Sequence, residues 1–247
     1  MYAKFKSLAR TIIPNKLLFQ NEEFFRFFHG IWYSGNTYQC NICNHKISTF
    51  LKVFGKKQQC PFCGSLARSR RLYHVLEEEV GLSGTVLDFS PPRCLYRKLK
   101  KNKAIEYYST DYENEFLADY RYDITDIPIA DNFFDRIICY HVLEHIHDDH
   151  KAMTELYRVL KPGGTLLIQT PFKDGEIYED SSITTTEERL KHFGQEDHVR
   201  IYSVAGLVAR LKKSGFSTVE TRNYATNDIF SKKHGFEISE TIIMVSK

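Results

Sequence analysis

Four of the six cysteines stand in two matched pairs whose spacing suits a metal ion. Cys40 and Cys43 form one Cys-x-x-Cys pair, and Cys60 and Cys63 form a second after sixteen intervening residues. Two such pairs can present four thiolates to one tetrahedral ion, the pattern of a structural zinc site. Two disulfides are a poorer explanation in a reducing compartment, and a thioredoxin-type motif needs one pair. The sequence therefore predicts a zinc ribbon over residues 36–70.

Carboxylates follow several strand-like segments. "TVLDFS" places Asp88 at the end of one, "IEYYSTD" places Asp111 at the end of the next, and Asp123 precedes a third, "FFDRIICY". Ligands of parallel sheets bind beyond the carboxyl ends of the strands, and these oxygens would accept from ribose hydroxyls, an amino group or an adenine amine. An aspartate after a strand is also a common turn-former.

Histidines and acidic residues gather in two further segments. "HVLEH" contains His141, Glu144 and His145 and matches the inverted zinc-protease pattern, although its strand context argues against a protease. "KHFGQEDHVRIY" pairs Asp197 with His198, and the carboxylate could orient the imidazole for proton abstraction. His198 is the first candidate base and His145 the second. The alternative is a solvated loop with capping and salt-bridge roles.

Strand and helix signals alternate from residue 84 onward, which predicts an α/β fold with a mostly parallel sheet and helices on both faces. Amphipathic helices are expected over 94–101, 148–160 and 203–216, with Ser203 as an N-cap. "KPGG" is expected to end the second helix in a turn. "STVETRNY" and "ETIIMVSK" add two last strands. Cys94 and Cys139 are expected to be small buried apolar residues.

The N-terminal residues 1–35 read as an amphipathic arm, with basic and apolar residues interleaved up to Pro14. This arm would pack on its own domain or a partner, or touch an anionic membrane surface. No apolar run approaches the length of a membrane span and no secretory signal is evident, so a cytoplasmic location is expected. The net charge of +3 gives weak support to a nucleic-acid partner. Arg68, Arg70 and Arg71 are expected on the exposed face of a helix capped by Ser65.

These motifs resemble class I S-adenosylmethionine-dependent methyltransferases of the type 11-like kind. The resemblance rests on "VLDFSPPRC", "YYSTDYE", "YDITDIPIADNFFDRIICYHVLEHI" and "ELYRVLKPGGTLLIQTP", and it covers roughly residues 84–247. The cysteine pairs and the proline-containing first motif are similar to a bacterial subgroup of these enzymes. The resemblance implies a Rossmann-like sheet whose last strand is antiparallel, in a methyltransferase domain over residues 71–247.

The resemblance also implies roles for individual residues. Asp88, Phe89 and Ser90 would line the methionine end of S-adenosylmethionine, and Asp111 would accept from the ribose hydroxyls. Asp123 and Ile124 would flank the adenine. Tyr140 and His141 would close the pocket after the fourth strand.

The first motif departs from the family pattern, since Ser90, Pro92 and Cys94 stand where three glycines are usual. Proline fixes φ and removes an amide donor, so the turn is either rebuilt or lost, and the other retained positions favour a rebuilt site.

The acceptor is less constrained. "CYHVLEH" stands where amino-directed DNA methyltransferases carry a Pro-Pro motif, which disfavours a base amine and leaves a small-molecule or glycan hydroxyl as the first expectation. A tRNA or rRNA methyltransferase that grips RNA with the ribbon, or a catalytically silent scaffold, are the alternatives. The sequence leaves the oligomeric state open.

Overall fold

The computed structural model describes residues 21–53, 57–225, 228–236 and 239–247, which form two compact units. The cysteine unit comprises Met1–Glu79 and Ala225–Ser239, and the sheet unit comprises Val80–Tyr224 and Glu240–Lys247. This grouping differs from the expected boundary at residue 70 and from a single unit over 71–247. Residues 71–79 and 225–239 belong with the ribbon because buried arginine side chains connect them to it, as described below.

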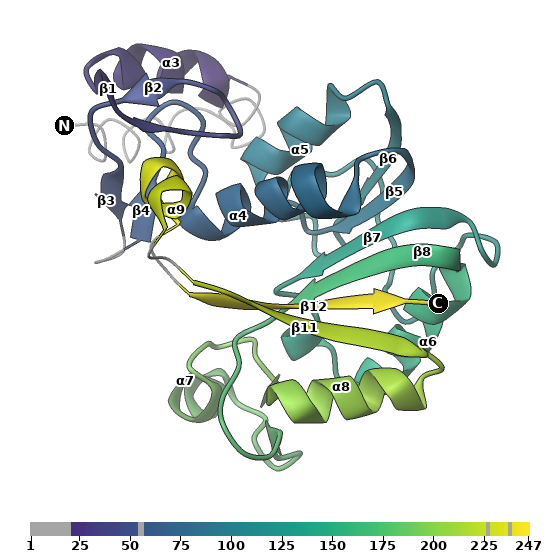
Figure 1. Ribbon diagram of the computed structural model, residues 1–247. Helices are drawn as coiled ribbons and strands as arrows, with labels where there is room; N and C mark the ends of the chain where they lie inside the picture. The colour runs from purple at the N-terminus through teal and green to yellow at the C-terminus, as the bar shows by residue number, and fades with distance from the viewer. Residues whose placement is uncertain (1–20, 54–56, 226–227, 237–238) are drawn as a thin grey trace. The chain divides into compact units, whose positions relative to one another are not determined.

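The sheet unit is built on one six-stranded sheet of order β11-β12-β8-β7-β5-β6 (Figure 1). Its strands are β5 (Gly84–Phe89), β6 (Ile105–Thr110), β7 (Phe134–Tyr140), β8 (Leu160–Gln169), β11 (Thr218–Tyr224) and β12 (Glu240–Ser246). The pairs β5–β6, β5–β7 and β7–β8 are parallel, and β12 runs antiparallel to both β8 and β11. This confirms the expected fold class, including the antiparallel last strand.

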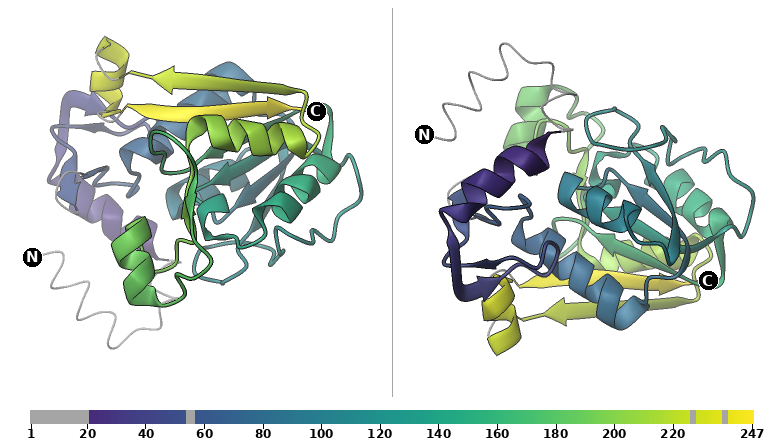
Figure 2. Two further views of the ribbon diagram at one scale, coloured as in Figure 1. Left: turned by 90° about the horizontal axis from the view of Figure 1, so that it is seen from below. Right: turned by 90° about the horizontal axis from the view of Figure 1, so that it is seen from above.

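Helices cover both faces of this sheet. α5 (Arg93–Lys100) packs on β6, whereas α6 (Asp149–Val159) and α8 (Val204–Lys213) pack on the opposite face and on each other (Figures 1 and 2). Their apolar stripes enter one hydrophobic core with the inner faces of the strands, as the 3.6-residue periodicity predicts. Ser203 caps α8 by accepting from the Gly206 amide at 3.1 Å, as expected. Cys94 and Cys139 are buried, also as expected.

The "KPGG" segment differs from the expected turn. Phe134 pairs with Leu160 and Arg136 with Thr165, so the four residues between form a bulge inside β8. Gly163 supplies the required positive φ of 75°.

The cysteine unit contains short antiparallel pairs and helices. Its elements are α3 (Glu22–Ile31), β1 (Ser34–Gln39), β2 (Lys46–Ile47), β3 (Leu51–Val53), β4 (Lys57–Gln59), α4 (Ala67–Val75), the π-helical η1 (Leu76–Val80) and α9 (Ile229–His234). β3 and β4 pair antiparallel, and the residues that join them lie outside the described residues. The remaining elements, all in the sheet unit, are η2 (Leu143–His145), β9 (Tyr178–Glu179), α7 (Thr186–Phe193) and β10 (Arg200–Ile201).

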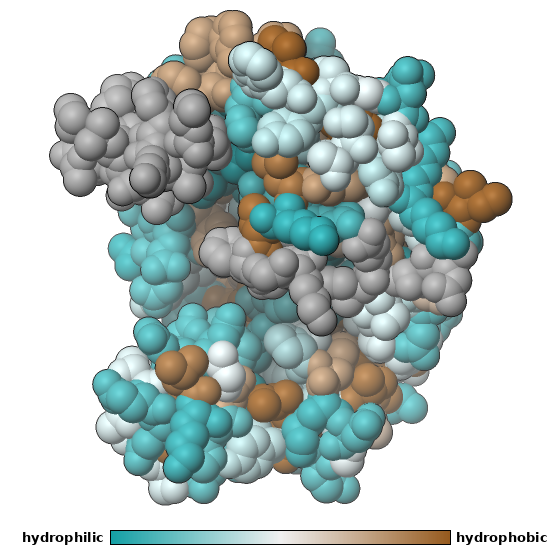
Figure 3. Space-filling view, turned by 90° about the vertical axis from the view of Figure 1, so that its left-hand side faces the viewer, coloured by the Kyte–Doolittle hydropathy of each residue, from teal (hydrophilic) through white to brown (hydrophobic). Residues whose placement is uncertain are grey.

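Most of the predicted amphipathic arm, residues 1–20, lies outside the described residues. Its last part is α3, which belongs to the cysteine unit: a Cβ on Gly30 would lie 2.4 Å from the Phe62 ring. Among the described helices, none is long and apolar enough to cross a membrane. Hydrophobic residues lie in small groups among hydrophilic ones on the face shown in Figure 3.

Candidate functional site

The four paired cysteines converge on one point. The Sγ atoms of Cys40 and Cys63 lie 3.6 Å apart, and those of Cys43 and Cys60 lie 3.7 Å apart. Sulfurs bound at about 2.3 Å around a tetrahedral zinc ion lie about 3.8 Å from one another, so the arrangement fits zinc. Ser65 was expected to cap the following helix. Instead it is buried, and its Oγ lies 3.2 Å from the Cys63 sulfur and 3.3 Å from the Cys40 sulfur.

Two matching turns present these sulfurs. The Asn44 amide donates to the Cys40 carbonyl at 2.8 Å, and the Gly64 amide donates to the Cys60 carbonyl at 2.9 Å. Asn44 and Gly64 both have positive φ, 61° and 77°. Glycine adopts this conformation without strain, and asparagine adopts it more readily than most other residues.

The predicted exposure of Arg70 and Arg71 is wrong. Both side chains are buried, whereas Arg68 is exposed. The Arg70 guanidinium donates to the carbonyls of Ser65 at 2.7 Å, His234 at 2.7 Å and Gly235 at 2.9 Å, and it lies over the Phe50 ring. Arg71 donates to the Phe236 carbonyl at 3.1 Å. These arginines hold the 225–239 segment within the cysteine unit, which explains why buried cations are tolerated here.

In the sheet unit, Ser90 joins the carboxyl ends of β5 and β6. Ser90 adopts a positive φ of 47°, and its hydroxyl donates to Asp111 Oδ1 at 2.7 Å. The Ser90 amide donates to the Thr110 carbonyl at 2.7 Å. Pro92 occupies the N-cap of α5 with φ −55°, so the strand–turn–helix unit is retained without the glycines. The other Asp111 oxygen accepts from the amides of Glu115 at 2.6 Å and Phe116 at 2.9 Å.

Asp88 lies deeper in the same region. It is 2% exposed and accepts from the Tyr107 hydroxyl at 2.8 Å. Burial raises the pKa of Asp88 to about 7, although the hydrogen bond from Tyr107 opposes this shift. Phe89 and Ile124 are buried members of the hydrophobic core. Asp123 accepts from both the amide and the hydroxyl of Thr125 at 2.8 Å, which is the turn-forming role that the sequence left open.

Beyond β7, His141 connects two strand ends. Its φ is 55°, its amide donates to the Gln169 carbonyl at 2.8 Å, and its Nδ1 lies 3.1 Å from Glu144 Oε1. Tyr140 beside it is 9% exposed. Gln169 Oε1 and Thr170 Oγ1 are buried, and neither has a hydrogen-bond partner among the described residues. Sequence reasoning missed these two residues, although "IQTP" placed them after a buried strand.

Three side chains beyond β7 form a compact polar cluster. Glu144, His145 and His198, here called the Glu–His cluster, place their ligand atoms within 4.8 Å of one another. The rings of His145 and His198 are 4.7 Å apart, and His145 Nδ1 lies 3.1 Å from Asp197 Oδ2. Burial lowers the pKa of His198. His198 is 3% exposed, so the solvated-loop alternative is wrong for this residue, whereas Asp197 is 69% exposed.

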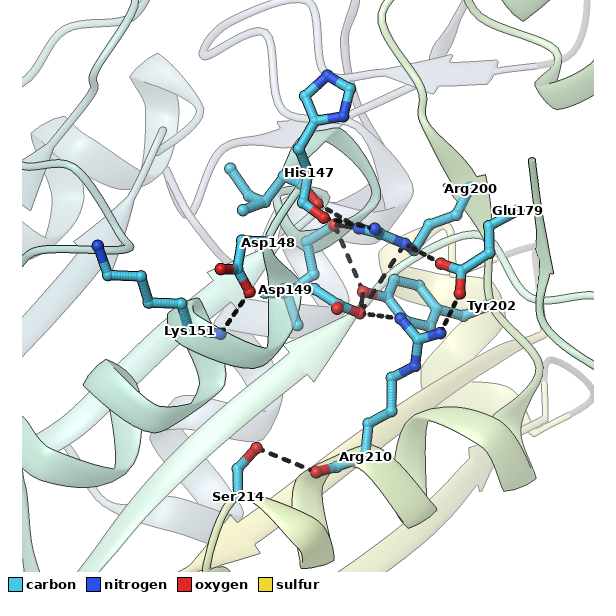
Figure 4. A network of polar contacts seen from close by, with 11 residues as sticks. His147, Asp148, Asp149, Lys151, Glu179, Arg200, Tyr202, Arg210 and Ser214 are labelled. Atoms are coloured by element: carbon cyan, nitrogen blue, oxygen red, sulfur yellow. Dashed lines mark hydrogen bonds and ion pairs between the residues drawn. The ribbon is translucent and has the colours of Figure 1, made fainter. Parts of the chain in front are cut away.

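A buried ionic network fixes the segment that carries His198. Arg200 donates to the His147 carbonyl at 2.9 Å and to Glu179 at 2.9 Å, and Arg210 and the Tyr202 hydroxyl both donate to Asp149 at 2.5 Å (Figure 4). The Val199 amide donates to the Glu144 carbonyl at 2.9 Å. The network therefore positions residues 198–202 against residues 144–149.

Several of the predicted site residues, Asp88, Ser90, Asp111, Tyr140 and His141, lie where β5, β6 and β7 end. β5, β6, β7 and β8 are parallel, so their carboxyl ends share one edge of the sheet. Asp88 and Glu144 both act electrostatically on the buried thiol of Cys139, whose pKa is raised by burial and by these two charges. The edge thus has a part around Asp88, Ser90 and Asp111 and a part formed by the Glu–His cluster.

Comparison with known proteins finds methyltransferases similar to part of this chain. A family described as "Methyltransferase domain" matches residues 69–168. An uncharacterized methyltransferase, YcgJ of Bacillus subtilis, is 27% identical over 159 residues, covering 62% of this chain and 61% of that protein. A demethylmenaquinone methyltransferase of Streptomyces avermitilis is 27% identical over 131 residues, covering 47% and 55%. The chain spans 35–37% of the length of three other curated relatives.

Solved structures agree on the fold. A methyltransferase dependent on S-adenosylmethionine from Archaeoglobus fulgidus matches with a TM-score of 0.52 and 15% identity, covering 73% of this chain and 92% of that one. The [4+2]-cyclase SpnF matches similarly, with a TM-score of 0.51 and 18% identity over 72% and 80%. At this identity the likeness establishes the fold alone, and one fold can host several chemistries. The match over residues 69–168 and the shared fold agree with the resemblance to class I S-adenosylmethionine-dependent methyltransferases.

Proposed function

We propose that this protein transfers a methyl group from S-adenosylmethionine to a hydroxyl group of a small molecule or glycan. The observation that carries the proposal is the single sheet edge at which a methyltransferase domain gathers both its strand-end carboxylates and the Glu–His cluster. Bound S-adenosylmethionine would supply an activated methyl group. The chain would supply binding, orientation and a group that handles the hydroxyl proton.

Several side chains suit the cofactor. Asp111 uses three of about four acceptor positions on its carboxylate within the chain, which leaves one for a ribose hydroxyl. The buried oxygens of Gln169 and Thr170 need partners that the described residues do not provide. A polar ligand at this edge would supply them. Asp88, Ser90, Tyr140 and His141 border the same edge, whereas Phe89 and Ile124 would support it from the core and Asp123 from its turn.

The acceptor would lie at the Glu–His cluster. A cavity of about 690 Å³ adjoins the ionic network and is lined mostly by charged and polar side chains, including His147, Asp149 and Arg200. No member of the Glu–His cluster lines it, but Val199 and Arg200, which directly follow His198, do. Its size is ordinary for a ligand site, and its polarity suits an acceptor with many hydroxyls, such as a sugar. His198 and His145, with Asp197 orienting the latter, are the candidates for receiving the hydroxyl proton. The segment after β7 carries histidines in place of the Pro-Pro motif of amino-directed DNA methyltransferases, which also favours a hydroxyl acceptor.

RNA is a less favoured acceptor, because Arg70 and Arg71 are engaged with backbone carbonyls inside the cysteine unit. We propose a structural role for zinc in that unit, since four convergent thiolates and a hairpin too small for its own core are typical of ribbons that fold on metal.

Calorimetric titration with S-adenosylhomocysteine tests the proposal without knowledge of the acceptor. Wild-type protein should bind in the micromolar range, and Asp111→Ala should weaken binding at least about tenfold, which is about 1.4 kcal/mol. Asp126→Ala, an exposed aspartate on the following loop, is the matched control and should bind as wild type. Thermal unfolding of each variant verifies that it is folded. A folded wild-type protein that does not bind would overturn the proposal and favour a scaffold.

A further inference from the structure

We infer that the Glu–His cluster of Glu144, His145 and His198 binds a divalent first-row transition-metal ion, at a site distinct from the four-cysteine centre. The inference deepens the proposed function, because the ion would lie at the acceptor side of the same sheet edge. It rests on unsatisfied buried atoms, on the distances between them and on the way neighbouring side chains orient them.

Two buried polar atoms of the cluster lack partners. Glu144 is 1% exposed and His198 is 3% exposed. Glu144 Oε2 and His198 Nδ1 make no hydrogen bond within the described part of the chain. Leaving a carboxylate oxygen and a ring nitrogen buried without partners is costly, so a further group is needed there. Because a carboxylate and a neutral imidazole both offer lone pairs, a cation satisfies both.

The distances suit a common ion. One ligand atom from each of the three residues lies within 4.8 Å of the others. Ligand atoms about 2.1 Å from one ion lie between about 3 and 4.2 Å apart. Small side-chain rotations would therefore bring all three ligand atoms to binding distance of one ion. Two histidines and one carboxylate match the ligand preference of divalent zinc, iron or manganese, with positions left open for another ligand.

Neighbouring groups already hold the ligands in the required orientation. His145 Nδ1 lies 3.1 Å from Asp197 Oδ2, which leaves Nε2 as the nitrogen that can bind an ion. His141 Nδ1 lies 3.1 Å from Glu144 Oε1, which leaves Oε2. A carboxylate on the far nitrogen of a ligating histidine is the usual second contact around metal sites. The ionic network of Arg200, Tyr202 and Asp149 fixes the chain next to His198, so the cluster is preorganised.

Such an ion would change how the acceptor is handled. A hydroxyl on a divalent ion loses its proton more readily than a free one. His145 and His198 would then hold the ion, and the proton would leave to solvent or to the exposed Asp197 carboxylate. The cation would also fix the acceptor oxygen at the sheet edge.

Manganese binding to the full-length, zinc-loaded protein tests the inference. Mn²⁺ prefers oxygen and nitrogen ligands to thiolates, so it distinguishes this cluster from the cysteine centre. Electron paramagnetic resonance should count one bound Mn²⁺ per chain, and pulsed spectra should show nitrogen couplings from imidazole. Glu144→Gln and His198→Gln should each weaken binding at least tenfold, because loss of even an outer hydrogen-bond partner of a metal ligand costs about 10-fold to 100-fold in affinity. His150→Ala, an exposed histidine on α6, should bind Mn²⁺ as wild type.

The outcomes separate this inference from the proposed function. No Mn²⁺ binding by the wild type, or equal binding by folded His198→Gln protein, would refute the ion site. If that same protein binds S-adenosylhomocysteine in the absence of divalent ions, the methyltransferase proposal stands and His198 remains a candidate base. Thermal unfolding with and without Mn²⁺ adds a check, since the ion should raise the melting temperature of the wild type but not of the two ligand variants.

Discussion

Replacing Arg70 by methionine should destabilise the cysteine unit severely. The side chain is 0% exposed, and its guanidinium makes three hydrogen bonds of 2.9 Å or less to backbone carbonyls. Methionine fills similar space but donates no hydrogen bond, so the carbonyls of Ser65, His234 and Gly235 lose a donor inside the unit. Removing one partner of a buried charged network costs about 3–5 kcal/mol. This is a large share of a total stability of about 5–15 kcal/mol.

Hydrogen exchange followed by mass spectrometry measures the loss where it should occur. Peptides covering α4 and α9 should exchange about 100-fold to 5,000-fold faster in Arg70→Met, as 3–5 kcal/mol implies, while peptides from the core strands of the sheet unit change less. Arg70→Lys keeps the positive charge but loses the planar guanidinium and its several N–H donors. Its exchange rates should lie between those of the wild type and Arg70→Met. Arg68→Ala is the matched control on the exposed side of α4 and should change stability by less than about 0.5 kcal/mol.

An exchange rate in Arg70→Met within threefold of wild type would refute the assigned role of this arginine. The same experiment bears on RNA binding. If neutralising Arg70 lowered RNA affinity without faster exchange, the side chain would have to be accessible, contrary to its burial. The prediction is that any loss of binding follows unfolding of the unit.

Two further predictions concern protonation and metal. Asp88 has a folded-state pKa of about 7, raised by burial above its usual 3.8. Its neutral form is therefore favoured in the folded protein, and its contribution to stability is complete below about pH 4 and is lost as the pH rises through 7. Between pH 4 and pH 8, the free energy of unfolding of the unliganded wild type, measured in urea, should fall by up to about 4 kcal/mol more than that of Asp88→Asn. If the free energies of unfolding of the two proteins changed with pH in parallel, the prediction would be wrong. Removal of zinc by a chelator, or Cys60→Ser, should unfold the cysteine unit, as seen by hydrogen exchange at β1 and α4. Cys139→Ser lies outside that unit and is the control; a chelated protein with unchanged exchange would count against a metal-dependent ribbon.

The spacing of apolar residues and the positions of capping and turn residues were sufficient to predict the sheet unit. The apolar stripe of α8, its Ser203 cap and the alternation of strands with helices follow from local residue pattern, and the observed strand directions agree with them. The same local reasoning predicted the cysteine centre, because two Cys-x-x-Cys pairs restrict the possible ligand geometry. These features depend on residues close in sequence.

Residues whose partners are distant in sequence were predicted poorly. Arg70 looks like a surface residue on a helix with an apolar stripe, yet its partners are 164 and 165 residues away, in a segment that returns from the sheet unit. Helical spacing cannot reveal that return. The cluster of His198 with Glu144 has a similar cause, since 54 residues separate them and the ionic network brings them together. The sequence nominated His198 for its neighbours and gave no sign of its burial.

The turn after β5 shows how residues other than the glycines of the family motif can stabilise a strand–turn–helix connection. Glycines reach positive φ without strain, whereas Ser90 does so at a cost of about 1–3 kcal/mol, which the surroundings must offset. The Ser90 hydroxyl and amide bind Asp111 and Thr110 at 2.7 Å each, and the two prolines reduce the freedom of the unfolded chain. The turn is therefore held to the end of β6 by two bonds, and a glycine could make the amide bond but not the hydroxyl bond. His141 repeats the arrangement at the end of β7, with positive φ and an amide bound to the Gln169 carbonyl. Strained residues persist where the surrounding structure fixes them, and here they stand at two strand ends on the edge where the ligands are proposed to bind.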